Sequence, residues 1–135
     1  MSETVNGSEP AKPSGTILIL TDDLMFGSRI SAEARAAGFT TRSCKTVEKL
    51  LEVAPTLNVM GAVVDLGVAG LEQCKPLLDG LRALKPDLPC MGYGSHVDAR
   101  LLGTARENGY HPVLPRSRFV EELGGIMIEW SNKCC

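Results

Sequence analysis

The sequence predicts an α/β protein in which a five-stranded parallel sheet is doubly wound, with strand order 2-1-3-4-5. Short apolar runs alternate along the chain with stretches of helical period, and Gly, Pro or a short polar residue marks each change. The first apolar run, TILIL, is uninterrupted, as is typical of strands that are buried on both faces. Right-handed crossovers leave few arrangements for five βα units, and this order is one of them.

The first half of the chain contains three predicted strands and two predicted helices. The run at 16–21 is the first strand, and Gly38 ends a helix over 24–37 that carries Ile30 and Ala34 on one apolar stripe. A strand at 39–43 and a helix at 47–53 follow, and Pro55 ends that helix. The third strand occupies 59–65.

The second half continues the same alternation. Leu77, Leu81 and Leu84 recur at helical spacing in a helix predicted over 71–84, and Pro76 inside it indicates a late start or a kink. The remaining predicted strands are 88–93 and 110–114, and the remaining predicted helices are 97–108 and 119–130. The chain therefore supplies five strands and five helices.

Composition indicates one globular domain. The 135 residues are 44% hydrophobic and 22% charged, and the net charge of −2 gives no reason to expect nucleic-acid binding. No apolar stretch approaches the roughly 18 residues that span a bilayer, and the N-terminus lacks the pattern of a signal peptide. We therefore expect a cytoplasmic protein that does not bind membranes.

The domain limits follow from local composition. Residues 1–15 are rich in Gly, Pro and Ser and are predicted to be a disordered leader, residues 16–130 form the domain, and residues 131–135 form a C-terminal tail. The five cysteines contain no C-x-x-C pair, so free thiols are expected, and Cys134 and Cys135 are placed in the tail. Because so few residues follow Trp130, we expect any output to pass through another protein.

Acidic side chains follow two strands that this order makes neighbours. Asp22 and Asp23 follow the first strand, and Asp65 ends the third. Their carboxylates would converge at the carboxyl edge of the sheet, where such folds bind ligands. Like charges this close need a cation, and hard oxygen ligands favour Mg²⁺. The alternative interpretation is that Asp22 and Asp23 cap the following helix and Asp65 opens a turn.

The motifs ILILTDD and VVDLGVAG resemble those of receiver domains, the phosphoacceptor modules of bacterial two-component signalling. The resemblance covers about 16–130 and implies the flavodoxin-like receiver architecture. It implies that Asp22, Asp23, Asp65 and the carbonyl of Gly67 bind Mg²⁺. It also implies that Asp65 accepts a phosphoryl group from a histidine kinase or a phosphotransfer protein.

Other positions depart from the receiver pattern. The segment VLPRSRF places Arg116 where receivers carry a phosphate-contacting lysine and Ser117 where they carry proline. Arg116 keeps the charge but not the shape of lysine. The position of the switch hydroxyl falls on Gly94, with Ser95 beside it as a substitute, and that of the switch aromatic falls on Val113. Both parts of the ordinary switch are thus altered.

Three functions remain open on this evidence. The first is a stand-alone receiver, not an enzyme, that signals through a downstream protein partner or a homodimer. The second is a pseudo-receiver that binds or dimerises without phosphorylation. The third is a small enzyme or cofactor binder of the flavodoxin or cobalamin-binding type. TDDLMFGS disfavours the third because it would direct carboxylates at a flavin phosphate, and Asp65-Leu66-Gly67 lacks the cobalamin histidine.

Overall fold

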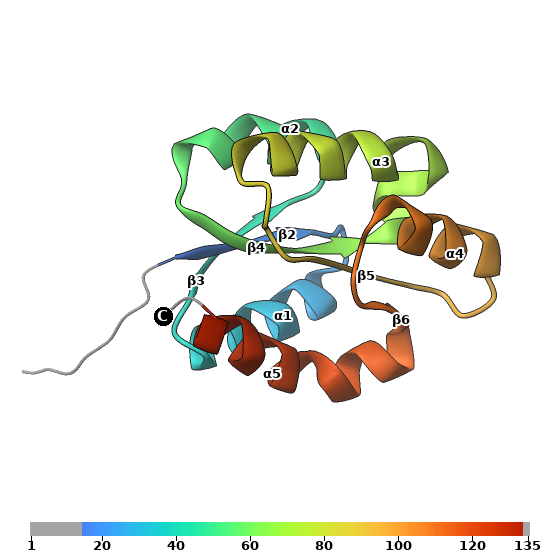
Figure 1. Cartoon of the computed structure of the whole chain (residues 1–135). Coiled ribbons are helices and arrows are strands. Elements are labelled where there is room, and N and C mark those ends of the chain that lie inside the picture. The colour runs from blue at the N-terminus through green and yellow to red at the C-terminus, as the bar shows by residue number, and fades with distance from the viewer. Residues whose placement is uncertain (1–14, 134–135) are drawn as a thin grey trace, which may run out of the picture.

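The computed structural model describes residues 15–133. Within this range the chain forms five strands and five α-helices, as predicted, with a short 3₁₀ helix after α2 (Figure 1). The strands are β2 (Thr16–Leu20), β3 (Thr40–Cys44), β4 (Val59–Asp65), β5 (Cys90–Gly94) and β6 (Val113–Pro115). The helices are α1 (Leu24–Ala36), α2 (Val47–Val53), α3 (Leu66–Leu84), α4 (Ala99–Asn108) and α5 (Arg116–Lys133), and the 3₁₀ helix is η2 (Ala54–Thr56). Most of the predicted leader, with Cys134 and Cys135, lies outside the described residues.

The sheet is parallel and has the order β3-β2-β4-β5-β6. This confirms the predicted order 2-1-3-4-5. Helices α2, α3 and α4 cover one face of the sheet, and α1 and α5 cover the other (Figure 1). β4 is the central strand, so a residue at its carboxyl end has neighbours on both sides.

The two faces of the sheet bury different kinds of side chain. The core under α2, α3 and α4, which we call the aliphatic core, consists mainly of Leu, Val, Ala and Cys and contains one aromatic residue, Tyr110. The core under α1 and α5, which we call the aromatic core, contains four aromatic residues: Phe39, Tyr93, Phe119 and Trp130. Both sets come from the same strands because successive strand residues point to opposite faces.

Helix α3 begins earlier than the sequence analysis predicted. It starts at Leu66 instead of 71 because the Asp65 carboxylate accepts a hydrogen bond from the N–H of Gly67 and caps the first turn. The backbone then breaks at Gly70, whose φ of 76° is accessible mainly to glycine. The predicted kink is therefore at Gly70 and not at Pro76.

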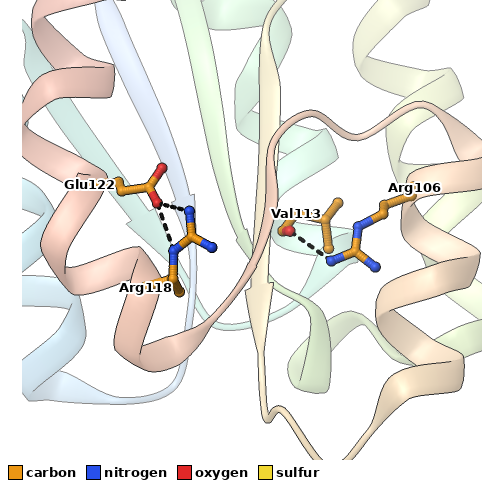
Figure 2. Close-up of polar contacts among 4 residues, drawn as sticks. All are labelled: Arg106, Val113, Arg118 and Glu122. Atoms are coloured by element: carbon orange, nitrogen blue, oxygen red, sulfur yellow. Dashed lines mark hydrogen bonds and ion pairs between the residues drawn. The ribbon is translucent and has the colours of Figure 1, made fainter.

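Strand β6 and helix α5 follow one another without a loop. α5 starts at Arg116, directly after β6, and continues to Lys133, so it extends the predicted helix at both ends and includes part of the predicted tail. β6 is an edge strand, and the guanidinium of Arg106 on α4 donates to the carbonyl of Val113 at 3.1 Å (Figure 2). On α5, an ion pair joins Arg118 to Glu122 one turn later (Figure 2).

Two further sequence predictions concern the thiols and the membrane. Cys44, Cys74 and Cys90 are buried free thiols, as expected. Among residues 15–133, no helix is long and apolar enough to cross a bilayer.

Candidate functional site

Strand pairing brings three polar side chains together at the carboxyl edge of the sheet. Leu20 of β2 pairs with Val64 of β4, so Thr21, the next residue, lies beside Asp65. Asp65 in turn pairs with Tyr93 of β5. Three neighbouring strands thus place a threonine, an aspartate and a tyrosine side by side.

Asp65 is the centre of this group and is only 3% exposed. Its Oδ1 accepts the N–H of Gly67 at 3.0 Å, and its Oδ2 accepts the hydroxyl of Thr21 at 3.4 Å. The hydroxyl of Tyr93 lies 3.2 Å from Thr21 Oγ1 and 3.5 Å from Asp65 Oδ2. Both oxygens of the carboxylate therefore have donors, as a buried polar group requires.

Burial dominates the electrostatics of the site. It raises the pKa of Asp65 above its ordinary value, and the N–H of Gly67 and the charge of Arg116 oppose this rise. The neighbouring carboxylate of Asp22 adds to it. Burial also raises the pKa of Tyr93, so the phenol stays neutral at physiological pH and remains a hydrogen-bond donor.

The acidic pair lies at the same edge but is exposed to solvent. Asp23 caps α1, where its Oδ1 accepts the N–H groups of Met25 at 2.9 Å and Phe26 at 3.0 Å. The capping interpretation is therefore correct for Asp23. Asp22 acts on Asp65 through its charge.

The predicted Mg²⁺ ligands are not gathered into a ready-made metal site. Within residues 15–133, no three side chains of His, Cys, Asp or Glu lie close enough together to hold a metal ion. The donors nevertheless have the right chemistry, since Asp22, Asp23 and Asp65 supply hard oxygens. In the described hydrogen bonds, helix capping uses only Oδ1 of Asp23. The contact shown for Gly67 with Asp65 is made by its N–H, so a role for its carbonyl in metal binding stays a prediction.

Arg116 lies near the acidic edge at the start of α5. Its guanidinium carbon is 6.0 Å from the centre of the Phe26 ring, and its charge lowers the pKa of Asp65. The structure thus brings the predicted basic residue to the predicted acceptor. Its contact with a phosphoryl group stays a prediction.

The candidate substitute for the switch hydroxyl is not joined to Asp65. Ser95 is half-buried, and its Oγ accepts the N–H of Val97 at 3.4 Å. Within the described part of the chain, no hydrogen bond connects Ser95 to Asp65. Gly94 is buried at the end of β5 and Val113 is buried on β6, so neither supplies a polar group.

Sequence reasoning missed Thr21 and the hydroxyl of Tyr93. Tyr93 is fully buried, with an exposed fraction of 0%. The Tyr93 ring stacks with Phe26, at a centroid distance of 5.3 Å, and with Phe119, at 4.2 Å, and these two rings also stack with each other at 6.1 Å. The missed signal was the position of Thr21 directly after β2 and of Tyr93 in β5, the two strands that flank β4, which only the strand register could reveal.

A cavity of about 520 Å³ adjoins the acidic pair between α1 and the end of β3. Its lining includes Thr21, Asp22 and Asp23, together with Ser28 and Ser31 of α1. The acidic pair therefore borders open space, whereas Asp65 is not part of the cavity lining.

Comparison with solved structures identifies the fold. A response regulator from Thermotoga maritima superposes with a TM-score of 0.73 over 89% of this chain and 99% of its own, at 14% identity. The chain has the fold of a receiver domain. A CheY-like protein from Pseudomonas aeruginosa gives a TM-score of 0.68 over 87% and 93% at 18% identity. A receiver domain from Francisella gives 0.70 over 90% and 99% at 16% identity.

Among the comparisons with known proteins, only the comparison of structures finds the receiver fold. No family model matches the chain, and no curated protein matches it. At these identities the shared property is the fold, so the chemistry of the site must be argued from the residues that line it.

Proposed function

We propose that this chain is a stand-alone receiver-like protein of phosphorelay signalling, in which Asp65 accepts a phosphoryl group. The observation that carries this proposal is the position of Asp65. It ends the central strand of a receiver fold, beside Asp22 and within the electrostatic reach of Arg116. A carboxylate so placed lies in the crevice where doubly wound sheets act on ligands.

The proposed reaction is the transfer of a phosphoryl group between side chains. An oxygen of Asp65 forms a bond to the phosphorus of a phosphohistidine on a histidine kinase or a phosphotransfer protein. The phosphorus–nitrogen bond breaks, and its electron pair returns to the histidine nitrogen. Arg116 would offset the charge of the transferred oxygens.

Mg²⁺ belongs to the same proposal. Asp22, Asp23, Asp65 and the carbonyl of Gly67 would hold it, and when bound it would neutralise charge on the phosphoryl group. The hard oxygen donors of the acidic edge support this assignment.

The test is intact mass after incubation with Mg²⁺ and acetyl phosphate. We expect the wild-type chain to gain the mass of one phosphate and Asp65→Asn to gain none. Asp79→Asn is a matched control, because Asp79 is exposed on α3 and pairs with Lys75 there. A gain that Asp65→Asn retains would contradict the proposal.

Signal output would use protein contacts made in the cytoplasm. A downstream protein partner or a second copy of the chain would bind the phosphorylated form preferentially, since a ligand shifts a two-state protein only through such a difference in affinity.

A second candidate function is a pseudo-receiver that binds or dimerises without phosphorylation. It is favoured by Ser95, which does not contact Asp65, and by the absence within residues 15–133 of a group of three metal-binding side chains. Absence of phosphate gain in the mass experiment would select this function.

A further inference from the structure

We propose that Thr21 and Tyr93 are positioning residues that bind the inward-facing oxygen of Asp65, oppose its phosphorylation, and transmit its state to α1 and α5. This inference rests on the proposed function of Asp65 as the phosphoacceptor. It assigns roles to two hydroxyl groups that the motifs of the sequence do not include.

The hydroxyl of Thr21 has one arrangement that satisfies all its neighbours. Its oxygen accepts the N–H of Asp23 at 3.1 Å and the hydroxyl of Tyr93 at 3.2 Å. A threonine hydroxyl has two lone pairs and one proton, so both lone pairs are then in use. The proton remains for Asp65 Oδ2, which lies 3.4 Å away. The pair therefore forms a directed chain from Tyr93 through Thr21 to Asp65.

Burial assigns different roles to the two oxygens of Asp65. Tyr93 is 0% exposed and Thr21 is 6% exposed, so Oδ2, which they contact, faces the aromatic core. A phosphoryl donor in solution cannot reach an oxygen covered in this way. The reacting oxygen is therefore Oδ1, whose protein partner is the N–H of Gly67.

Phosphorylation weakens the contact between the hydroxyls and Oδ2. Before transfer, Oδ2 belongs to a carboxylate, and hydrogen bonds to an ionised acceptor are about twice as strong as neutral ones. After transfer to Oδ1, Oδ2 is the neutral carbonyl oxygen of an acyl phosphate. Because the hydroxyl pair binds the unphosphorylated form better, it must shift the equilibrium away from the phosphorylated form.

The weaker hydrogen bonding at Oδ2 affects the aromatic core. The Tyr93 ring stacks with both Phe26 of α1 and Phe119 of α5, with ring centroids 5.3 Å and 4.2 Å away. The guanidinium carbon of Arg116 lies 6.0 Å from the centre of the Phe26 ring. A weaker bond at the Tyr93 hydroxyl therefore alters the packing of both helices.

The first experiment measures the half-life of the acyl phosphate after acetyl phosphate is removed. In hydrolysis, a water oxygen bonds to phosphorus, the bond from phosphorus to Asp65 breaks, and its electron pair restores the carboxylate. Both protons of the water leave with the phosphate, as dihydrogen phosphate. Without the hydroxyls the restored carboxylate is less stable, so we expect Tyr93→Phe and Thr21→Val to lengthen the half-life about fivefold.

Tyr110→Phe is the matched control for this measurement. Tyr110 is also buried, but its hydroxyl donates to the carbonyl of Cys74 at 2.6 Å in the aliphatic core. Its half-life should stay within about twofold of wild type. A half-life that Tyr93→Phe leaves unchanged or shortens would overturn the inference.

A second experiment needs no phosphorylation. In a double-mutant cycle of Asp65→Asn and Tyr93→Phe, we expect the loss of the Tyr93 hydroxyl to change the unfolding constant about fivefold more when Asp65 is charged than when Asn replaces it. The same cycle with Tyr110→Phe should show no coupling. If the chain takes up no phosphate, the proposed function fails, and this coupling alone decides whether the hydroxyl pair senses the charge of Asp65. Zero coupling overturns the inference.

Discussion

The aromatic and aliphatic cores differ in how they connect to Asp65. On the side of α1 and α5, the hydroxyl of Thr21 donates to the carboxylate, and the hydroxyl of Tyr93 donates to Thr21 and lies 3.5 Å from the same carboxylate oxygen. On the side of α3 and α4, the nearest switch positions are Gly94, which has no side chain, and Ser95, whose hydroxyl accepts a bond from its own loop. Side-chain hydroxyl contact with the acceptor therefore leads from Asp65 to α1 and α5, whereas α3 meets Asp65 through the backbone N–H of Gly67.

The largest predicted effects come from removing one large side chain from each core. Phe119→Ala should lower the free energy of unfolding by about 3–5 kcal/mol, and Leu78→Ala by about 2–5 kcal/mol, because both side chains are almost fully buried. Only Phe119→Ala should lengthen the half-life of the acyl phosphate, since Phe119 supports the Tyr93 ring. Urea unfolding and timed intact mass measure the two effects. Equal effects on the half-life would remove the distinction between the cores.

Adding a hydroxyl on the side of the aliphatic core should reduce the difference between the two cores in their contact with Asp65. A side chain at position 94 would place its Cβ 3.3 Å from a terminal methyl of Leu102, which can move. Gly94→Ser should therefore fold. Its hydroxyl should stabilise the transferred oxygens by about 1–3 kcal/mol, which would appear as faster phosphate uptake from acetyl phosphate.

Gly94→Ala is the matched control for that substitution, because it adds the Cβ without the hydroxyl. An equal gain in the uptake rate from both variants would mean that the backbone, and not the added donor, limits the reaction.

The pH dependence of stability tests whether burial or hydrogen bonding has the larger effect on the pKa of Asp65. Burial raises its pKa in the folded state above the ordinary value of 3.8, so the folded chain holds this proton more tightly than the unfolded chain. The contribution of Asp65 to stability must therefore fall as the pH rises from the unfolded pKa through the folded pKa. Asp65→Asn should gain stability relative to wild type over that rise, as measured by urea midpoints between about pH 4 and pH 7. If the stability of Asp65→Asn relative to wild type falls with rising pH, the hydrogen bonds to Asp65 affect its pKa more than burial does.

The smallest predicted effects use one reporter in each core. Cys90 lies in the aliphatic core, where burial raises its pKa to about 12, and Trp130 lies in the aromatic core. We expect phosphorylation to change the fluorescence of Trp130 and to leave the slow alkylation of Cys90 unchanged, as followed by peptide mass mapping. Faster alkylation without a change in fluorescence would reverse the assignment of the responding face.

Much of the fold follows from the sequence because its signals are local. Continuous apolar runs predict the buried strands, and β4 has the predicted bounds, 59–65. The predicted bounds are wrong where a side-chain hydrogen bond starts a helix in a segment that was expected to be a loop. The predicted start of α3 at 71 is wrong because the Asp65 carboxylate caps a helical turn that begins at Leu66, before the break at Gly70.

The candidate site could be predicted only in part for a similar reason. Asp22, Asp23 and Asp65 were recognisable because they follow apolar runs. The contacts of Thr21 and Tyr93 depend on the register between strands that are distant in the sequence, which no local pattern contains. The capping role of Asp23 was predictable in kind, but the use of its Oδ1 for both capping bonds required coordinates.

The direct junctions between strands and helices divide the site into stiff and adjustable parts. Asp65 and Arg116 lie where a strand passes into a helix without an intervening residue, whereas Asp22 and Ser95 lie in connecting segments. A connecting segment can rotate its backbone at little cost, but a junction residue can turn only if its strand and helix turn together. In hydrogen-exchange terms, the amides around the acceptor and the basic residue should open as one unit with the sheet, and the acidic pair should open independently and faster.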